Sequence, residues 1–358
     1  MDDLPIEVLL HVMDFLPLKS VFGVMRVSKK FELGSRIIVK TWKGLSLGSR
    51  GDGLSLPTYA LADVVSCDIP ERLESQVDME RSLLQMKNLK RLYVAPHTRP
   101  QFSNITINMM IENNAETLEV VHLPASEPFS MPRKPLPKLR DLQIHQTTAE
   151  RVQGYPMLTS YGVRCLNILD RSELFLLPVK LTSLSLGGFD FFWDTSAAIS
   201  HLVNLRHIQL TINYGPGDVQ ELMQCMQPFL HLTSIGLVNE NWSNPIQAYA
   251  VLLEIVKRYP NLTTLKLPNV DWDDESMDFL CRFRHLQHLV IGVNDNDSRW
   301  TNDDLRVFLT NGPIATLRTV AVNVKYWNGA QEIVDEVKRQ TGSILTFDYV
   351  VEPDPFRF

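Results

Sequence analysis

One spacing of apolar residues recurs along most of the chain: an apolar residue, two variable residues, a second apolar residue, one variable residue and a third apolar residue. The clear copies begin at Leu89, Leu118, Leu139, Val163, Leu181, Leu205, Leu232, Leu262, Leu286 and Leu317. Their starts lie 18 to 31 residues apart, and weaker copies begin at Trp42, Val64 and Ile344. Because the last two apolar residues alternate with other residues, each copy is expected to contain a short strand buried on one face. A period of this length predicts stacked structural repeats.

Stretches with helical periodicity and helix-end signals lie between the later strands. They cover residues 247–259, 303–311 and 330–340. One strand and one helix are too small to bury their own apolar faces, so neighbouring copies are expected to stack with their strands parallel. This predicts an α/β fold, a curved solenoid with a parallel sheet on its concave face and helices outside. The array resembles leucine-rich-repeat proteins.

The first 42 residues do not follow the repeat and predict three short helices. Eight of the residues between positions 6 and 16 are apolar, and they cannot all share one face of a helix. A module of this size has a core large enough to bury only one apolar stripe. The remaining apolar residues of this helix form a second stripe that needs another surface. The pattern favours two interpretations equally: this second stripe caps the adjacent end of the solenoid, or it docks onto a separate protein.

The order and spacing of these residues resemble an F-box. The string Leu4-Pro5-Ile6-Glu7-Val8-Leu9-Leu10 is followed by Val12, by Phe15-Leu16-Pro17 and by Val27-Ser28-Lys29-Lys30-Phe31. The F-box family binds the small SKP-type adaptor of cullin-RING ubiquitin ligases. The resemblance implies that the adaptor contacts Leu4, Pro5, Val8, Leu9, Val12, Phe15 and Leu16. It also implies two domains, an F-box-like helical module at 1–42 and a leucine-rich-repeat solenoid at 43–358.

The composition argues against nucleic-acid-binding, membrane-spanning and secreted proteins. The formal net charge of −6 is too negative for a dedicated nucleic-acid-binding protein. The four cysteines never form a CxxC pair, and no apolar run reaches the ~20 residues that span a bilayer. Nothing at the N-terminus resembles a secretory signal. We therefore expect a cytoplasmic or nuclear protein with no membrane contact.

Large aromatic residues follow the ends of the later strands. They are Trp193, Tyr214, Trp242, Trp272, Trp300 and Trp327, and acidic residues lie near them in the sequence. The simpler interpretation is that each aromatic residue packs against the start of the next helix, where acidic residues are favoured. The functional interpretation is an aromatic, acidic rim that binds a basic segment of a client protein.

The variable positions that flank the middle apolar residue of each strand are expected to face the concave side. They include Arg91, Tyr93, Asp141, Gln143, Cys165, Asn167, Ser183, Ser185, His207, Gln209, Thr264, Lys266 and His288. Several of these side chains are small and neutral, so this face carries no strong charge of either sign.

No catalytic constellation is evident. The string Gly44-Leu45-Ser46-Leu47-Gly48 matches GxSxG, but a nucleophile elbow needs a helix directly after it, and glycines follow here. His285 and His288 have no evident third metal ligand. We therefore expect no catalytic residues, no metal site and no cofactor.

The predicted function is that of a substrate-recognition subunit of an SCF-type ubiquitin ligase, as the F-box resemblance implies. One alternative is a leucine-rich-repeat scaffold, outside the ubiquitin system, whose N-terminal helices are only a cap. A remote second alternative is an enzyme that uses Ser46 as its nucleophile.

Overall fold

The chain folds into two compact units, Met1–Leu158 (unit 1) and Thr159–Phe358 (unit 2), in a computed structural model. The structure describes residues 45–46, 65–69, 80, 83–94, 104–123, 134–144, 155–163, 174–189, 197–212, 222–224, 226–239, 246–271, 274–293, 302–311, 316–323, 330–341 and 346–350. The predicted domain boundary after residue 42 lies outside these residues and stays a prediction. Each unit is described by itself.

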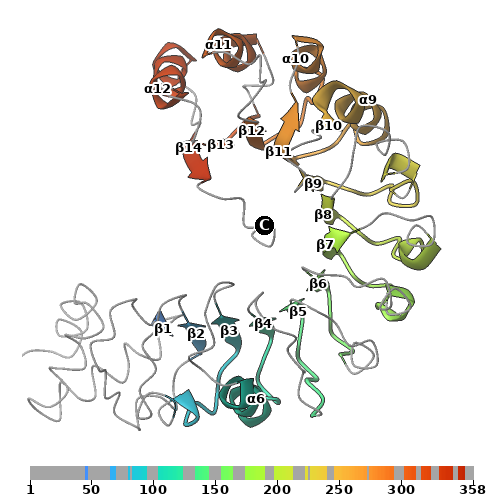
Figure 1. Cartoon of the computed structure of the whole chain (residues 1–358), viewed down its shortest axis with the longest axis vertical. Helices are drawn as coiled ribbons and strands as arrows, with labels where there is room; N and C mark the ends of the chain where they lie inside the picture. Colours follow the sequence, from blue (N-terminus) through green and yellow to red (C-terminus); the bar gives the residue numbers. More distant parts are fainter. Residues whose placement is uncertain are drawn as a thin grey trace, which may run out of the picture. The chain divides into compact units, whose positions relative to one another are not determined.

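Unit 1 contains a row of parallel strands in sequence order. They are β1 (Leu45–Ser46), β2 (Ser66–Ile69), β3 (Arg91–Val94), β4 (Val120–His122) and β5 (Asp141–Ile144). Helix α6 (Asn104–Asn113) connects β3 to β4 and lies on one side of the row (Figure 1). This is the strand-plus-connection repeat that the apolar spacing predicts.

Unit 2 continues the same architecture with longer strands. They are β6 (Ser160–Val163), β7 (Ser183–Phe189), β8 (His207–Ile212), β9 (Ser234–Asn239), β11 (Thr264–Asp271), β12 (His288–Val293), β13 (Thr319–Asn323) and β14 (Thr346–Val350), all paired in parallel, with β10 (Ile246–Gln247) added beside β11. Within this unit the strands follow the inner side of an arc, and helices α9 (Ala248–Arg258), α10 (Asp274–Leu280), α11 (Asn302–Asn311) and α12 (Ala330–Thr341) lie outside it (Figure 1). The α/β fold with a parallel sheet is confirmed, and the three predicted helices correspond to α9, α11 and α12.

The repeated apolar residues form the core. In β3 the three positions Leu89, Leu92 and Val94 are at most 6% exposed. The corresponding residues of β8, Leu205, Ile208 and Leu210, are fully buried. The weaker copies at Trp42, Val64 and Ile344 also lead into real strands, β1, β2 and β14.

One predicted copy is wrong. The copy that begins at Val163 would place a strand around Leu166 and Ile168, but the strand is Ser160–Val163 and its Tyr161 and Val163 pair with Leu184 and Leu186. The true copy is therefore Leu158-Tyr161-Val163, and the residues that flank its middle position are Ser160 and Gly162 rather than Cys165 and Asn167. The prediction failed because Tyr161 takes a position that is aliphatic in the nine other clear copies.

Nine junctions between the repeats use the same backbone contact. The carbonyl of the residue after the first apolar position accepts hydrogen bonds from two consecutive N–H groups of the next repeat. At β8 the Thr182 carbonyl accepts from Arg206 (2.9 Å) and His207 (3.0 Å), and the Arg206 carbonyl then accepts from Thr233 (2.8 Å) and Ser234 (3.0 Å). The same contact is made by the carbonyls of Val65, Lys90, Glu119, Thr159, Thr233, Thr263 and Gln287. It satisfies buried backbone donors where the chain enters each strand.

A buried asparagine fixes α6 to the turn before β3. Asn114 is 1% exposed, and its Oδ1 accepts the N–H of Leu89 at 2.8 Å. Its Nδ2 donates to the carbonyls of Met86 and Met110, each at 2.8 Å. One side chain therefore satisfies backbone groups from two neighbouring repeats.

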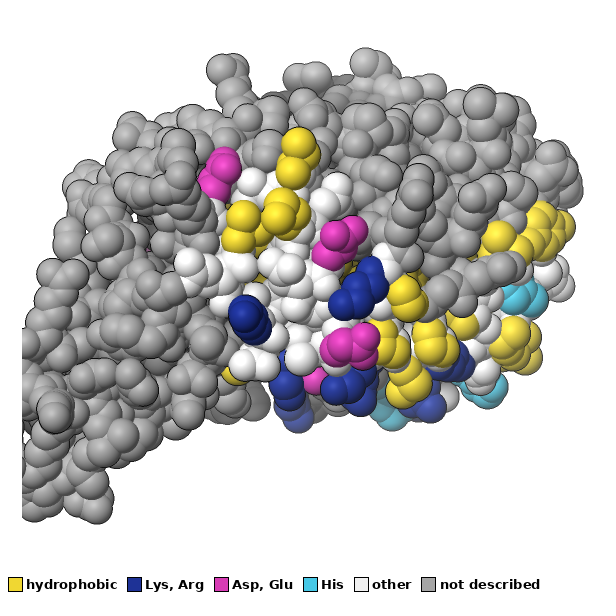
Figure 2. All heavy atoms as spheres, turned by 90° about the horizontal axis from the view of Figure 1, so that it is seen from below, with side chains coloured by type: hydrophobic (Ala, Val, Ile, Leu, Met, Phe, Trp, Pro, Cys, Tyr) yellow, Lys and Arg dark blue, Asp and Glu magenta, His cyan; other side chains and the backbone are white. Residues whose placement is uncertain are grey.

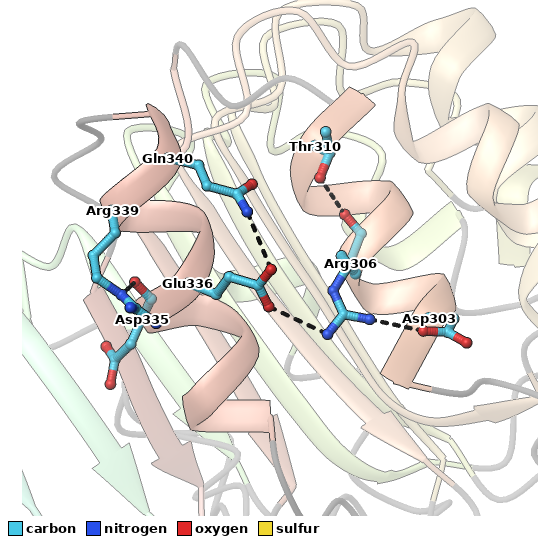
Figure 3. A network of polar contacts seen from close by, with 7 residues as sticks. All are labelled: Asp303, Arg306, Thr310, Asp335, Glu336, Arg339 and Gln340. Atoms are coloured by element: carbon cyan, nitrogen blue, oxygen red, sulfur yellow. Dashed lines mark hydrogen bonds and ion pairs between the residues drawn. The ribbon is translucent and has the colours of Figure 1, made fainter.

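Exposed polar contacts join the outer helices α11 and α12 (Figure 3). Arg306 donates to Asp303 of its own helix at 2.8 Å and to Glu336 of α12 at 3.2 Å, and Glu336 also accepts from Gln340 at 3.1 Å. Because these groups are partly exposed to solvent, the ion pairs contribute at most about 1 kcal/mol each. They orient two helices whose buried faces supply most of the stability.

Asn114→Ala should lower the free energy of unfolding by about 3 kcal/mol, because buried backbone groups of Leu89 and Met86 lose their partners. The matched control is Asn113→Ala, which removes only an exposed hydrogen bond to the Leu84 carbonyl and should cost about 0.5 kcal/mol. Urea unfolding followed by circular dichroism measures both. Equal losses in the two variants would contradict the role given to Asn114.

Candidate functional site

The residues predicted to bind partners lie outside the described part of the chain. This holds for the adaptor-binding residues Leu4, Pro5, Val8, Leu9, Val12, Phe15 and Leu16, and for the aromatic residues Trp193, Tyr214, Trp242, Trp272, Trp300 and Trp327. Both sets stay predictions. The described residues instead define the inner faces of the strands, the faces opposite the helices.

In unit 1 the inner face carries a cluster of polar side chains, the unit 1 polar cluster, which comprises Arg91, Tyr93, His122 and Asp141. Strand pairing aligns Arg91 with Val120 and Asp141, and aligns Tyr93 with His122 and Gln143. Adjacent strands lie about 4.8 Å apart, so side chains on neighbouring strands come into contact. The cluster is therefore assembled from three successive repeats.

Two contacts between side chains hold the cluster together. His122 Nε2 lies 3.0 Å from Asp141 Oδ2, and both side chains are about a quarter exposed (23% and 27%). The rings of Tyr93 and His122 meet edge to face with their centroids 4.8 Å apart. The imidazole is therefore fixed between a carboxylate and an aromatic ring.

The cluster offers both donors and acceptors to a ligand. Asp141 Oδ2 accepts at the surface of the cluster, while Asp141 Oδ1 is buried and has no hydrogen-bond partner among the described residues. Arg91 is exposed and supplies guanidinium donors. Burial raises the pKa of Tyr93; nearby Arg91 opposes the rise, and Asp141 and Asp68 add to it. The phenol is therefore a neutral hydrogen-bonding group at pH 7.

The inner face of unit 2 is neutral by comparison. Its strands place Ser185, Gln209, Thr211 and Ser234 at 2–3% exposure. Gln209 lies over Gly236, where an added Cβ atom would come within 3.1 Å of Gln209 Cγ. A glycine at position 236 therefore leaves the space that the glutamine side chain occupies.

Two histidines and one lysine complete this face. His288 Nδ1 lies 2.7 Å from Thr319 Oγ1 on the next strand. Burial lowers the pKa of His288, and Arg318 and Lys266 lower it further. Burial also lowers the pKa of His207, with Arg206 adding to the effect. Both imidazoles are therefore neutral at pH 7, which leaves Lys266 as the charged group among the described inner-face residues from β7 to β12.

Sequence reasoning placed Arg91, Tyr93 and Asp141 on the inner face but missed His122. The copy that begins at Leu118 could have indicated it, because Val120 and His122 flank Val121, the middle apolar residue of that copy. The pairing of His122 with Asp141 joins residues of different repeats, so only the strand register reveals it. The sequence predicted an inner face without strong charge. This prediction fits the described strands of unit 2 better than those of unit 1, where Arg91 and Asp141 lie.

Ser46 is the last residue of strand β1, where Leu45 and Ser46 pair in parallel with Cys67 and Asp68. The residues that follow Ser46 in the GxSxG string lie outside the described part of the chain. Across the described ranges, no three His, Cys, Asp or Glu side chains are grouped as a metal site would require.

Comparisons with known proteins bear on the two parts of the chain. Residues 1–32 match the family model for the F-box domain, which confirms the resemblance of the N-terminal residues. The structure is similar to that of an internalin from Listeria monocytogenes, with a TM-score of 0.34 and 11% identity, covering 92% of this chain and 93% of that chain. No protein with a curated description matches the sequence. None of the described helices has the length and apolar character needed to cross a membrane.

The histidine pKa values predict how stability changes with pH. Because the folded-state pKa of His207 is below that of the unfolded chain, the unfolded state binds more protons once the pH falls below about 6.5, and stability declines. His207→Gln should therefore lose less stability than the wild type between pH 7 and pH 5. Urea unfolding at a series of pH values measures the difference. The interpretation fails if both proteins show the same dependence on pH.

Proposed function

We propose that this F-box protein is the substrate-recognition subunit of an SCF-type cullin-RING ubiquitin ligase. In this proposal the N-terminal module binds the SKP-type adaptor and the repeats bind a client protein. The single observation that carries it is the F-box match at residues 1–32 on the same chain as an array of parallel repeats. A module for attachment is thereby joined to a module suited to protein recognition.

The adaptor-binding half of the proposal rests on excess apolar surface. Eight apolar residues between positions 6 and 16 exceed what one face of a short helix buries. In F-box proteins such residues lie against the adaptor, which assigns this role to Leu9, Phe15 and their neighbours in the motif. An apolar helix face that meets a groove in a partner is a common mode of recognition.

The client-binding half rests on the inner faces of the strands. The unit 1 polar cluster combines a cation, a neutral phenol and a buried carboxylate oxygen within three repeats. A client that contacts this cluster would be selected by hydrogen bonding. The aromatic rim proposed from Trp193 to Trp327 would add contacts with a basic segment.

The proposed mechanism is proximity. A client held on the repeats has a raised effective concentration near the ubiquitin-transfer machinery that the adaptor recruits. In this mechanism the side chains of the chain bind and orient the client, and the bond-forming steps belong to the other subunits. Rigid attachment of the client surface to successive strands favours transfer to lysines that lie within reach.

Leu9→Asp or Phe15→Asp should abolish co-purification with the SKP-type adaptor, because a carboxylate placed in an apolar interface is strongly unfavourable. The repeats should remain folded, as judged by the circular dichroism spectrum and the thermal midpoint. Val307→Asp is the matched control, because Val307 is an apolar residue of α11 that is 53% exposed, and it should retain the adaptor. Full adaptor binding by both F-box variants would instead favour a scaffold with an N-terminal cap.

Arg91→Glu combined with Tyr93→Ala should remove the client while leaving adaptor binding intact, because these side chains belong to the unit 1 polar cluster. Proximity labelling under proteasome inhibition compares this variant with the wild type and with Leu9→Asp. Client proteins should be labelled by the wild type and by Leu9→Asp but not by the inner-face variant. Arg339→Glu, a charge reversal on the outer helix α12, is the control. An unchanged set of labelled proteins in the inner-face variant would exclude this cluster from recognition.

A further inference from the structure

Three successive turns of unit 2 expose an apolar residue at the same place. Val179 is 52% exposed, Val203 is 49% exposed and Leu230 is 77% exposed. Each lies four residues before a strand residue of matched register, namely Ser183, His207 and Ser234. The three side chains therefore occupy equivalent positions in stacked repeats, at the edge where the chain enters the strands.

The first two of these turns, which carry Val179 and Val203, are in direct contact. Asn204 Nδ2 donates to the Val179 carbonyl at 3.0 Å, and His201 Nε2 lies 3.0 Å from the Leu177 carbonyl. Phe175, in the same turn region as Val179, is 56% exposed. Because paired strands lie about 4.8 Å apart, residues of matched register in neighbouring repeats follow one another in a row along this edge.

The apolar character of this row is not required by the repeat. The first leucine of each copy, two residues further on, is already buried: Leu181 and Leu205 are 0% exposed and Leu232 is 3% exposed. Other repeats place Lys87, Glu116, Pro260 or Arg284 at the equivalent position. Exposed apolar side chains at three consecutive turns therefore serve something other than the core.

Positive charge borders the row. Lys180 and Arg206 are exposed, and neither forms an ion pair with a described residue. Further along the same edge, Arg284 and His285 are also exposed. In Figure 2, Lys, Arg, His and apolar side chains lie along one border of the described surface, with Asp and Glu side chains beside them.

We propose that this surface, the entry edge of unit 2 (Phe175, Val179, Lys180, Val203, Arg206 and Leu230), binds an acidic amphipathic helix of a partner protein. Its apolar side chains would lie on Val179, Val203 and Leu230, and its carboxylates would pair with Lys180 and Arg206. The fit follows from spacing, because the pitch of a helix, 5.4 Å, is close to the separation of the repeats. This inference does not depend on the F-box or on a role in ubiquitin transfer.

A helix explains the surface better than a lipid bilayer does. The row is three repeats long and narrow, which suits apolar residues that recur once per helical turn. Bound carboxylates near Lys180 and Arg206 would be partly exposed, so the attraction should be screened over about 8–10 Å at moderate salt. Affinity is therefore expected to fall as salt concentration rises.

The test uses the full chain and a fluorescein-labelled peptide of about 18 residues, with Leu once per helical turn and Glu elsewhere. A second peptide carries Lys in place of every Glu. Fluorescence anisotropy should show binding of the Glu peptide that weakens with salt, and no binding of the Lys peptide. Val203→Ser combined with Leu230→Ser should weaken binding at least about tenfold, as should Lys180→Glu combined with Arg206→Glu.

Controls separate this surface from general effects on the fold. Val307→Ser removes an equally exposed valine from α11, and Arg339→Glu reverses a charge on α12; both should bind the Glu peptide as the wild type does. Thermal midpoints verify that the edge variants are folded. Equal binding of the two peptides, or undiminished binding by both edge variants, would overturn the proposal. Binding to phosphatidylserine vesicles without binding to the Glu peptide would also overturn it, in favour of a lipid surface.

Discussion

The structure depends on the way each repeat enters its strand. One carbonyl accepts two consecutive N–H groups from the next repeat, as the Thr182 and Arg206 carbonyls do. Strands as short as β4 (Val120–His122) have too little apolar surface to be stable alone, so they persist because both neighbours supply hydrogen bonds and a shared core. The contact also fixes register, since a slip of one residue would exchange the buried and exposed faces of the strand.

The register determines which positions of each repeat are buried and which lie on a surface. The core positions must be apolar in every repeat, but the residues of the inner face and of the entry edge can differ from one repeat to the next. Unit 1 therefore holds a His122–Asp141 pair beside Tyr93, whereas the described inner-face residues from β7 to β12 are neutral apart from Lys266. The entry edge of unit 2 shows the same freedom, because valine and leucine replace the polar residues or proline found at equivalent turns.

The sequence predicted the repeat period and α9, α11 and α12 well, because both follow from local periodicity. The prediction from sequence failed at one repeat. Tyr161 occupies a position that is aliphatic in the other clear copies, so the copy was wrongly placed at Val163. The prediction also missed a fourth buried position in each repeat, three residues before the first leucine. Its residue type varies too much to show a pattern in the sequence. The buried residues at this position are Met86, Leu136, Tyr155, Leu202, Phe229, Tyr259 and Phe283. The His122–Asp141 pair spans two repeats and requires the register. Exposure at Leu230 cannot be distinguished from burial by composition alone.

The two proposed recognition surfaces differ in the specificity they would give. On the inner face of unit 1, recognition through hydrogen bonds would penalise a ligand that leaves a polar group of the cluster unpaired. On the entry edge of unit 2, recognition through apolar contact and charge would accept many sequences of the same pattern. The unit 1 polar cluster would therefore be the more selective of the two surfaces, because hydrogen bonds constrain the geometry of a ligand more than apolar contacts do.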